Sequence, residues 1–189
     1  MKFTAKYVRE YFWQTRIRTV FNWVWQIALV LIIAFGFSYY FCMNVVVQES
    51  SMEPTLAPGE KVLINTATYI FGSPERGDII AFYTSEEEDA SIHIKRVIGL
   101  PGETIQIIDG SIYIDGEIYL EDNDFPMIVN PGLAEEAITL GSSEYFVLGD
   151  SRNSSEDSRF ADVGNVKSSN IVGKLWLVVS PFSSFGLIQ

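Results

Sequence analysis

Cysteine and histidine are almost missing from this chain. Its 189 residues include one cysteine, Cys42, and one histidine, His93. A single cysteine cannot form a disulfide within the chain, and the two residues are too few for a metal centre of cysteine and histidine ligands. We therefore expect a fold without disulfide bonds, and a function that uses no metal and no cofactor.

Positive charge is also scarce. The chain has 13 lysines and arginines against 24 acidic residues, so its net charge is −11 at pH 7. The basic residues gather at the N-terminus, where residues 1–20 hold Lys2, Lys6, Arg9, Arg16 and Arg18 against Glu10 alone. The remainder is acidic and lacks the basic face that nucleic-acid binding requires. We expect no nucleic-acid partner.

Charged residues of either sign are absent between Arg18 and Glu49. Within this window, residues 21–43 are almost entirely apolar, and about 20 apolar residues in a helix span the hydrocarbon core of a bilayer. A cleaved signal peptide would have a shorter apolar core and a cleavage site of small residues, which Phe41–Asn44 does not offer. A buried helix of a soluble protein would show a polar face. The segment therefore predicts one transmembrane helix over residues 21–43.

The flanks of this segment predict its orientation. Aromatic residues of the kind found at membrane interfaces lie near both ends, namely Trp23, Trp25, Tyr39 and Tyr40. The basic cluster precedes the segment, so the positive-inside rule places residues 1–20 in the cytoplasm and residues 44–189 outside. We expect a single-pass protein of the cell membrane, with the lipid bilayer as a partner.

Beyond residue 44 the pattern changes to short strands. The predicted strands are 45–47, 61–65, 78–83, 92–100, 104–108, 111–114, 145–148 and 174–179. Asp109-Gly110 predicts a tight hairpin, and Asp115-Gly116 repeats this signal. Residues 121–143 have no clear period and predict a long loop, and the charge run Glu86–Asp89 predicts a solvated loop tip. Residues 44–189 thus read as one mainly-β domain.

Two serines, Ser50 and Ser51, lie where the apolar segment meets this domain. A serine hydroxyl becomes a good nucleophile only when a neighbouring base takes its proton. His93 and Lys95 are candidates, and they share a face of their strand because strand side chains alternate. Burial disfavours the charged form of a lysine, so a lysine in an apolar strand can act as a base. A lysine that extends to water at a sheet edge fits the same spacing, so spacing alone leaves the choice open.

A polar loop follows the strand at 145–148. Residues 149–159 combine many hydroxyls with acidic and basic side chains. Such a stretch is typical of a surface loop of turn formers. It also suits a group of residues that hold a catalytic base in place.

Four strings in a fixed order indicate a family. They are SMEPTL (51–56), RGDIIAF (76–82), KRVIGLPGE (95–103) and GDSRNSSEDSR (149–159). Together, after an N-terminal apolar segment, they resemble the conserved boxes of the type I signal peptidases, the S26 family of bacterial leader peptidases with a Ser/Lys dyad. The resemblance covers about residues 20–181. It implies strongly twisted antiparallel sheets that carry the active site beside the membrane.

The resemblance also implies residue roles. Ser51 matches the nucleophile and Lys95 the general base. The remaining matches are Ser155 for a hydroxyl that hydrogen-bonds the lysine, Asp157 and Arg159 for an ion pair in the same loop, and Met52 and Pro54 for the turn that presents the serine and positions the substrate. The implied enzyme is a hydrolase, a membrane-bound serine endopeptidase that cleaves signal peptides from exported pre-proteins after small residues, as in Ala-x-Ala. The substrate would lie extended along a strand edge.

One residue departs from the family pattern. Some members carry a serine or another small residue two positions before the nucleophile, whereas this chain has Glu49. A carboxylate would repel the oxyanion that forms during acyl transfer. We therefore expect the Glu49 side chain to point away from the site, with backbone groups or the Ser50 hydroxyl taking its place.

Two other functions fit parts of the pattern. One is a membrane-anchored β-domain that binds peptides without protease activity. The other is a self-cleaving Ser/Lys protease like the stress-response repressors, although that class carries a DNA-binding domain where this chain has its apolar segment. The apolar residues 69–72 fit either a loop that dips into lipid headgroups or a part of the core.

Overall fold

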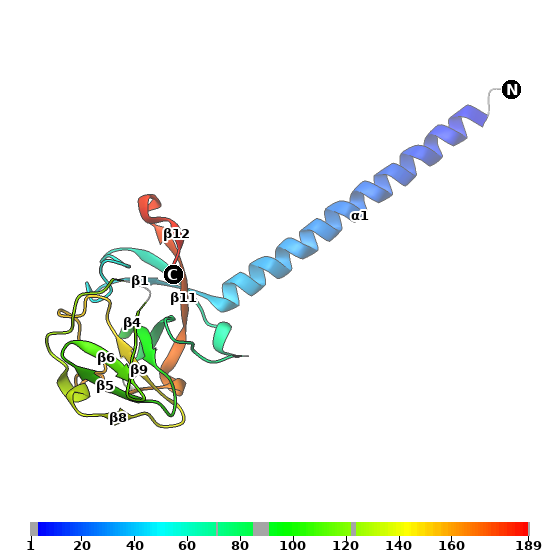
Figure 1. Ribbon diagram of the computed structural model, residues 1–189. Helices are drawn as coiled ribbons and strands as arrows, with labels where there is room; N and C mark the ends of the chain where they lie inside the picture. The colour runs from blue at the N-terminus through cyan, green and yellow to red at the C-terminus, as the bar shows by residue number, and fades with distance from the viewer. Residues whose placement is uncertain (1–3, 71, 85–90, 122–123, 189) are drawn as a thin grey trace. The chain divides into compact units, whose positions relative to one another are not determined.

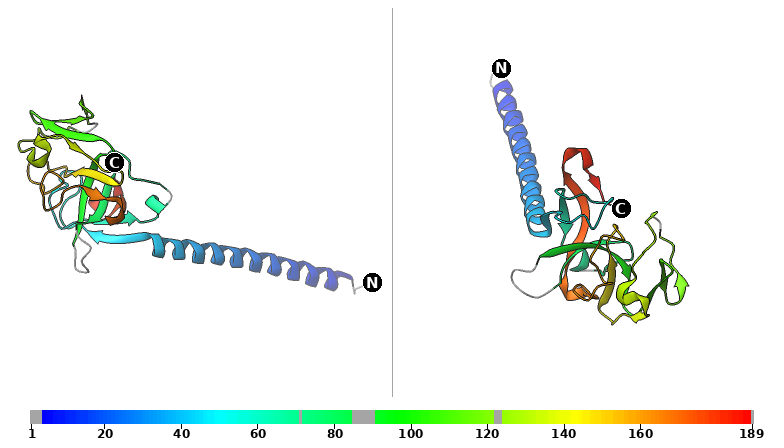
Figure 2. Two further views of the ribbon diagram at one scale, coloured as in Figure 1. Left: turned by 90° about the horizontal axis from the view of Figure 1, so that it is seen from below. Right: turned by 90° about the vertical axis from the view of Figure 1, so that its left-hand side faces the viewer.

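The computed structural model describes residues 4–70, 72–84, 91–121 and 124–188, with side chains omitted for residues 4–15 and 37–41. The predicted loop tip Glu86–Asp89 lies outside these ranges. The chain divides into two compact units, Met1–Phe41 and Cys42–Gln189. The first is a long helix and the second consists mostly of strands (Figure 1, with two further views in Figure 2).

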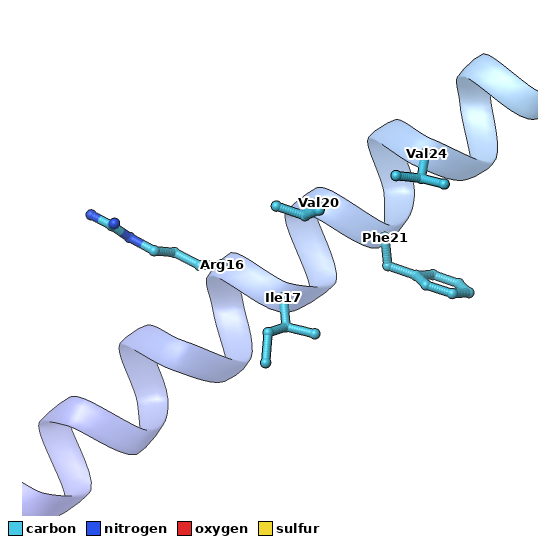
Figure 3. Close-up of a pocket in the computed structure, with 5 residues that line it drawn as sticks. All are labelled: Arg16, Ile17, Val20, Phe21 and Val24. Atoms are coloured by element: carbon cyan, nitrogen blue, oxygen red, sulfur yellow. The ribbon is translucent and has the colours of Figure 1, made fainter.

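Helix α1 covers Thr4–Phe41. Its stretch Arg16–Gly36 is long and apolar enough to cross a membrane by length and composition. The large apolar side chains of this stretch are exposed. Figure 3 shows four of them, Ile17, Val20, Phe21 and Val24, projecting from the helix beside Arg16. Trp23 is 63% exposed, which is far from the burial that the core helix of a soluble protein shows.

The helix ends at Phe41 rather than at Met43, because the following residues pair in a sheet. Strand β1 covers Cys42–Val46 and runs antiparallel to β2, Lys61–Asn65. In this register Cys42 lies opposite Asn65. The β-branched valines predict a strand here, and pairing with β2 extends that strand toward the helix.

The larger sheet has eight strands, and all its pairs are antiparallel. Its order is β1, β2, β11 (Ile171–Ser180), β3 (Ile79–Tyr83), β4 (Ile92–Gly99), β9 (Glu144–Leu148) and β10 (Val166–Lys167), with β12 (Gly186–Leu187) paired to β11. Strand β11, orange to red in Figure 1, pairs with β3 through its first half and with β12 through its second half. Short 3-10 helices flank these strands at Thr68–Ile70, Ser168–Asn170 and Phe182–Ser184.

The smaller sheet has four strands in the order β7 (Glu117–Ile118), β6 (Ser111–Ile114), β5 (Thr104–Ile108) and β8 (Ile138–Thr139). Asp109 and Gly110 join β5 to β6 with positive φ values of 49° and 79°, as a tight hairpin turn requires. The predicted long loop 121–143 contains a 3-10 helix, Gly132–Glu135, and β8. Strand β8 was not predicted because two residues show no period.

Both faces of the larger sheet are covered by apolar side chains at β3. Along β3, Ile79 and Ala81 belong to one apolar cluster, and Ile80 and Phe82 belong to another. The neighbouring strand β4 is therefore enclosed on both sides, and its two consecutive basic residues, Lys95 and Arg96, are buried as well. Such charges are tolerated only when they are paired or hydrogen-bonded, so the contacts of these residues define the most constrained part of the fold.

Candidate active site

Ser51 and Lys95 meet in the interior of the second unit. Lys95 lies on β4 and is fully buried, and Ser51 begins the turn that follows residues 48–50. The Lys95 Nζ donates a hydrogen bond of 2.7 Å to the Ser51 Oγ. An amine and a hydroxyl at this distance, shielded from water, can exchange a proton directly.

Glu49 also lies in this site, which contradicts the expectation that its side chain points away. Its Oε2 accepts hydrogen bonds from the Lys95 Nζ at 2.9 Å and from the Ser51 Oγ at 3.1 Å. The physical reason is the burial of Lys95, whose ammonium needs an anionic partner. Burial acts to raise the pKa of the Glu49 carboxyl, but the hydrogen bond and charge of Lys95, together with the His93 charge and the Ser51 hydrogen bond, hold that pKa below its ordinary value.

His93 approaches Glu49 rather than the serine. Its Nδ1 lies 3.4 Å from the Glu49 Oε1, and its ring packs 6.0 Å from that of Phe82. His93 and Lys95 both reach Glu49, as expected for residues on one face of a strand. Lys95 is therefore the basic residue in contact with Ser51, whereas His93 contacts Glu49.

The turn that presents Ser51 is anchored by apolar packing. Met52 is 1% exposed and packs in the same cluster as Leu56. The Leu56 N–H donates to the Met52 carbonyl at 2.9 Å. Pro54 lies exposed on the outside of this turn. Met52 thus fastens the turn to the core, while Pro54 belongs to its outer surface.

The polar loop 149–159 packs against this turn. The Ser151 N–H donates to the Ser51 carbonyl at 3.0 Å. The Arg159 Nε donates to the Asp157 Oδ1 at 2.7 Å, and the Asp157 Oδ2 accepts from the Gly149 N–H at 3.0 Å. The structure therefore brings Asp157 and Arg159 into the ion pair that the resemblance implies, and this pair holds the start of the loop.

Ser155 does not make the expected hydrogen bond to Lys95. Its side chain is buried, and its Oγ has no hydrogen-bond partner among the residues that the structure describes. The Lys95 Nζ is instead directed to Ser51 and Glu49. The predicted contact is thus replaced by the carboxylate of Glu49.

Arg96 and Asp150 form a buried pair that the sequence reasoning missed. The Arg96 Nε and Nη2 donate to the two carboxylate oxygens of Asp150, each at 2.8 Å. The Thr55 Oγ1 donates to the same carboxylate at 2.5 Å. Arg96 also donates to the Gly77 carbonyl at 2.9 Å. One ion pair therefore joins the serine turn, β4 and the polar loop, and a basic residue inside an apolar strand was the available signal for it.

A second pair explains two of the sequence strings. Arg76 and Glu103 are joined by a 2.5 Å contact between Nη2 and Oε1. The Glu103 Oε2 also accepts from the Leu100 N–H at 2.7 Å. These contacts hold the turn before β3 against the turn after β4, so the strings RGDIIAF and KRVIGLPGE form one structural unit.

A groove of about 410 Å³ opens beside Ser51. It is lined by residues 44–49, Ser51 and Met52 on one side and by Ser91, Ile92 and Ile94 on the other. Within the described strands, β1 pairs only with β2, and residues 92–95 of β4 pair only with β3. Both walls therefore carry backbone groups that an extended peptide can pair with.

The described ranges contain no group of three or more His, Cys, Asp or Glu side chains that could hold a metal ion. The groups that meet at the groove are instead a hydroxyl, an amine and a carboxylate. These groups suit acyl transfer through a serine nucleophile.

Comparisons with known proteins point to one family. The chain is 30% identical over 183 residues to signal peptidase IB of Staphylococcus aureus strain COL, covering 89% of this chain and 93% of that protein. It is 34% identical over 166 residues to signal peptidase I of Leptolyngbya laminosa, covering 85% and 79%. A crystal structure of a signal peptidase I from Enterococcus faecalis V583 aligns with a TM-score of 0.42 and 32% identity, over 54% of this chain and 96% of that chain.

The family match is broader than any one of the sequence strings. Residues 20–180 match the family described as signal peptidase, peptidase S26. This range includes the apolar segment, the serine turn, β4 and the polar loop. The chain therefore belongs to the signal peptidase family, peptidase S26.

Proposed function

We propose that this chain is a membrane-anchored serine endopeptidase that removes signal peptides, with Ser51 as nucleophile and Lys95 as general base. The observation that carries the proposal is the 2.7 Å hydrogen bond between the Lys95 Nζ and the Ser51 Oγ. The place of this contact supports the same roles, because Lys95 is fully buried and Ser51 is 5% exposed, so the two groups meet away from bulk water.

The reaction follows from these two groups. Neutral Lys95 takes the proton of Ser51 while the serine oxygen attacks the carbonyl of the scissile peptide bond. The Ser51 backbone N–H is the proposed donor to the resulting oxyanion. The Lys95 ammonium then gives its proton to the leaving amine, which frees the mature protein and leaves an ester on Ser51. Water, activated by the same lysine, hydrolyses this ester and releases the signal peptide.

The groove provides the proposed substrate site. A signal peptide in extended form would lie between β1 and residues 92–95 of β4 and pair with both backbones. Val47, Met52 and Ile94 contribute apolar side chains to the groove near Ser51. These side chains suit the small apolar residues of an Ala-x-Ala sequence.

The proposed location follows from helix α1 and the charges before it. Arg16–Gly36 has the length and composition of a membrane span. With basic residues 1–20 on the cytoplasmic side, the second unit would lie outside the cytoplasm. Signal peptides arrive in the same bilayer, so enzyme and substrate would meet by diffusion in the membrane plane.

Cleavage of one pre-protein with an Ala-x-Ala site, in membranes that hold either wild-type protein or Ser51→Ala, tests the proposal. We expect mature protein from the wild type and none from Ser51→Ala, while Ser50→Ala, a change at the exposed neighbouring serine, keeps activity. Lys95→Arg should lose about 100-fold or more of kcat/KM, because arginine stays charged and cannot act as a base.

Covalent labelling separates protease from peptide-binding domain. A serine-directed acylating probe should label Ser51 in the intact, detergent-solubilised wild type and fail to label Lys95→Ala. Equal cleavage by wild type and Ser51→Ala would contradict the proposal. Absence of labelling in folded wild type would favour a domain that binds peptides without cutting them.

A further inference from the structure

The Glu49 carboxylate opposes the transfer of a proton from Ser51 to Lys95. A carboxylate that accepts a hydrogen bond from a buried amine favours the charged form of that amine, because the opposite charges attract. An ammonium cannot take the proton of Ser51. The contacts of 2.9 Å to Lys95 and 3.1 Å to Ser51 therefore oppose the proton transfer that the proposed function requires.

Glu49 differs from its two partners in how firmly it is held. Lys95 is 0% exposed and Ser51 is 5% exposed, whereas the Glu49 side chain is 49% exposed. Glu49 belongs to residues 48–50, which lie outside any strand, and it lines the groove. A carboxylate in this position can turn into water with little loss of packing, and a peptide that fills the groove competes with it for the same space.

No other unpaired acidic group is aimed at Lys95 within the described residues. His93, on the same strand, reaches Lys95 only through Glu49. On the adjoining loop, Asp150 is paired with Arg96 and Asp157 with Arg159. Among the described residues, removal of Glu49 from the site therefore removes the one carboxylate that contacts Lys95.

We propose that Glu49 is a positioning residue that substrate displaces: it pairs with the Lys95 ammonium in the empty site and leaves when a peptide occupies the groove. The proposal rests on the proposed function, because it takes Lys95 as the base for Ser51. Displacement of Glu49 removes the counter-ion of Lys95, and the bound peptide excludes water from the groove. As Glu49 leaves, the ammonium releases its proton to bulk water, and the neutral amine forms in the complex with the peptide.

The pH dependence of cleavage tests whether the substrate displaces Glu49 from Lys95. The acid limb of kcat/KM reports the free enzyme, and the acid limb of kcat reports the complex. In wild type we expect the kcat/KM limb to lie at higher pH than the kcat limb. Glu49→Gln keeps the size of the side chain and removes its charge, so the kcat/KM limb should move to lower pH while the kcat limb stays. At a fixed pH on the acid limb, kcat/KM of the variant should rise about tenfold for every pH unit that the limb moves.

Glu53→Gln is the matched control. Glu53 lies exposed in the turn that begins at Ser51, and Glu53→Gln makes the same change in net charge, so both limbs should stay at their wild-type pH. Three results overturn the proposal: Glu49→Gln leaves both limbs in place, it moves both limbs equally, or it abolishes kcat at every pH in protein that is folded by circular dichroism. The second result means that Glu49 stays on Lys95 in the complex, and the third means that it acts in the chemical step.

Ser51→Ala in the same assay separates this proposal from the proposed function. If cleavage does not depend on Ser51, the proposed function fails, and the proposal for Glu49 falls with it. If cleavage depends on Ser51 and the limbs do not respond to Glu49→Gln, only the proposal for Glu49 fails.

Discussion

Gly149 shows how closely the polar loop approaches the serine turn. A Cβ added at this position would lie 2.1 Å from the Ser155 Oγ and 2.6 Å from the Ser51 carbonyl oxygen. Both distances are shorter than real Cβ contacts, and one of the two neighbours is backbone. Glycine is therefore the residue that allows the loop to donate its Ser151 N–H to Ser51.

Gly149→Ala should separate the loop from the turn. We expect a destabilisation of about 1–3 kcal/mol from overpacking and a loss of about tenfold or more in kcat/KM, equivalent to about 1.4 kcal/mol. Urea unfolding and cleavage assays measure the two effects. Gly186→Ala is the control, because the nearest atom to its added Cβ lies 4.0 Å away. A Gly149→Ala protein with wild-type stability and activity would show that the loop shifts freely.

At the level of single residues, the sequence predicted that Ser51 and Lys95 lie together, but it did not predict the hydrogen-bond partners of the residues around them. Ser51 and Lys95 were found through the strings around them and lie within hydrogen-bond distance. The direction of the Glu49 side chain was predicted wrongly, because the expectation took account of the oxyanion of the reaction and not of the resting lysine. The Ser155 contact failed for a related reason, since the carboxylate drew the amine elsewhere. Such choices depend on pairs far apart in the chain, which local patterns do not encode.

Strand β4 is the element in which charge and burial conflict most. Its consecutive residues Lys95 and Arg96 are 0% and 4% exposed. The first is balanced by Glu49 and the second by Asp150. The Arg96–Asp150 pair is the more deeply enclosed, so removal of one partner leaves a buried charge without compensation.

Asp150→Asn should therefore destabilise the protein by about 3–5 kcal/mol. Asparagine keeps the size of the side chain, so the loss reports the charge and its hydrogen bonds. Glu103→Gln is the comparison, because its pair with Arg76 is about a fifth exposed and should contribute about 0–1 kcal/mol. Thermal or urea unfolding in one detergent measures both. Equal losses in the two variants would contradict the assignment of Asp150 as the tighter partner.

Three strands were predicted to the residue because their apolar residues alternate or run together. The predicted 61–65, 104–108 and 111–114 coincide with β2, β5 and β6. Strands β8, β10 and β12 have two residues each, too few for any period, and they form because a neighbouring strand offers hydrogen-bond partners. Strand β11 is longer than predicted at both ends for the same reason.

At the scale of the whole molecule, the proposed orientation is open to a direct test. With Cys42→Ser as background, Ser169→Cys adds a single thiol at an exposed position of the second unit. A membrane-impermeant maleimide should label Ser169→Cys in intact cells and Lys2→Cys only after permeabilisation, because the basic N-terminus is expected inside. The Cys42→Ser protein should remain unlabelled. The reverse pattern would invert the proposed topology.

The two units could be predicted from composition, since the uncharged window and the stranded pattern differ so clearly. Their junction could not be placed to the residue. Both Cys42 and Met43 are compatible with a membrane helix by hydropathy, yet both pair with β2. Competition between helix and sheet at this point is decided by a partner strand that is formed by residues 61–65, and the local sequence does not contain that information.

The shortness of this junction limits what the proposed enzyme can cut. Residues 42–50 connect the end of α1 to Ser51, and an extended chain spans at most about 3.3–3.6 Å per residue. The nucleophile therefore cannot lie more than about 36 Å from the last residue of the helix. If that helix spans the bilayer, the length of the junction limits how far from the lipid surface a peptide bond can be cut. A bond beyond this distance stays uncut, even when its neighbouring side chains fit the groove.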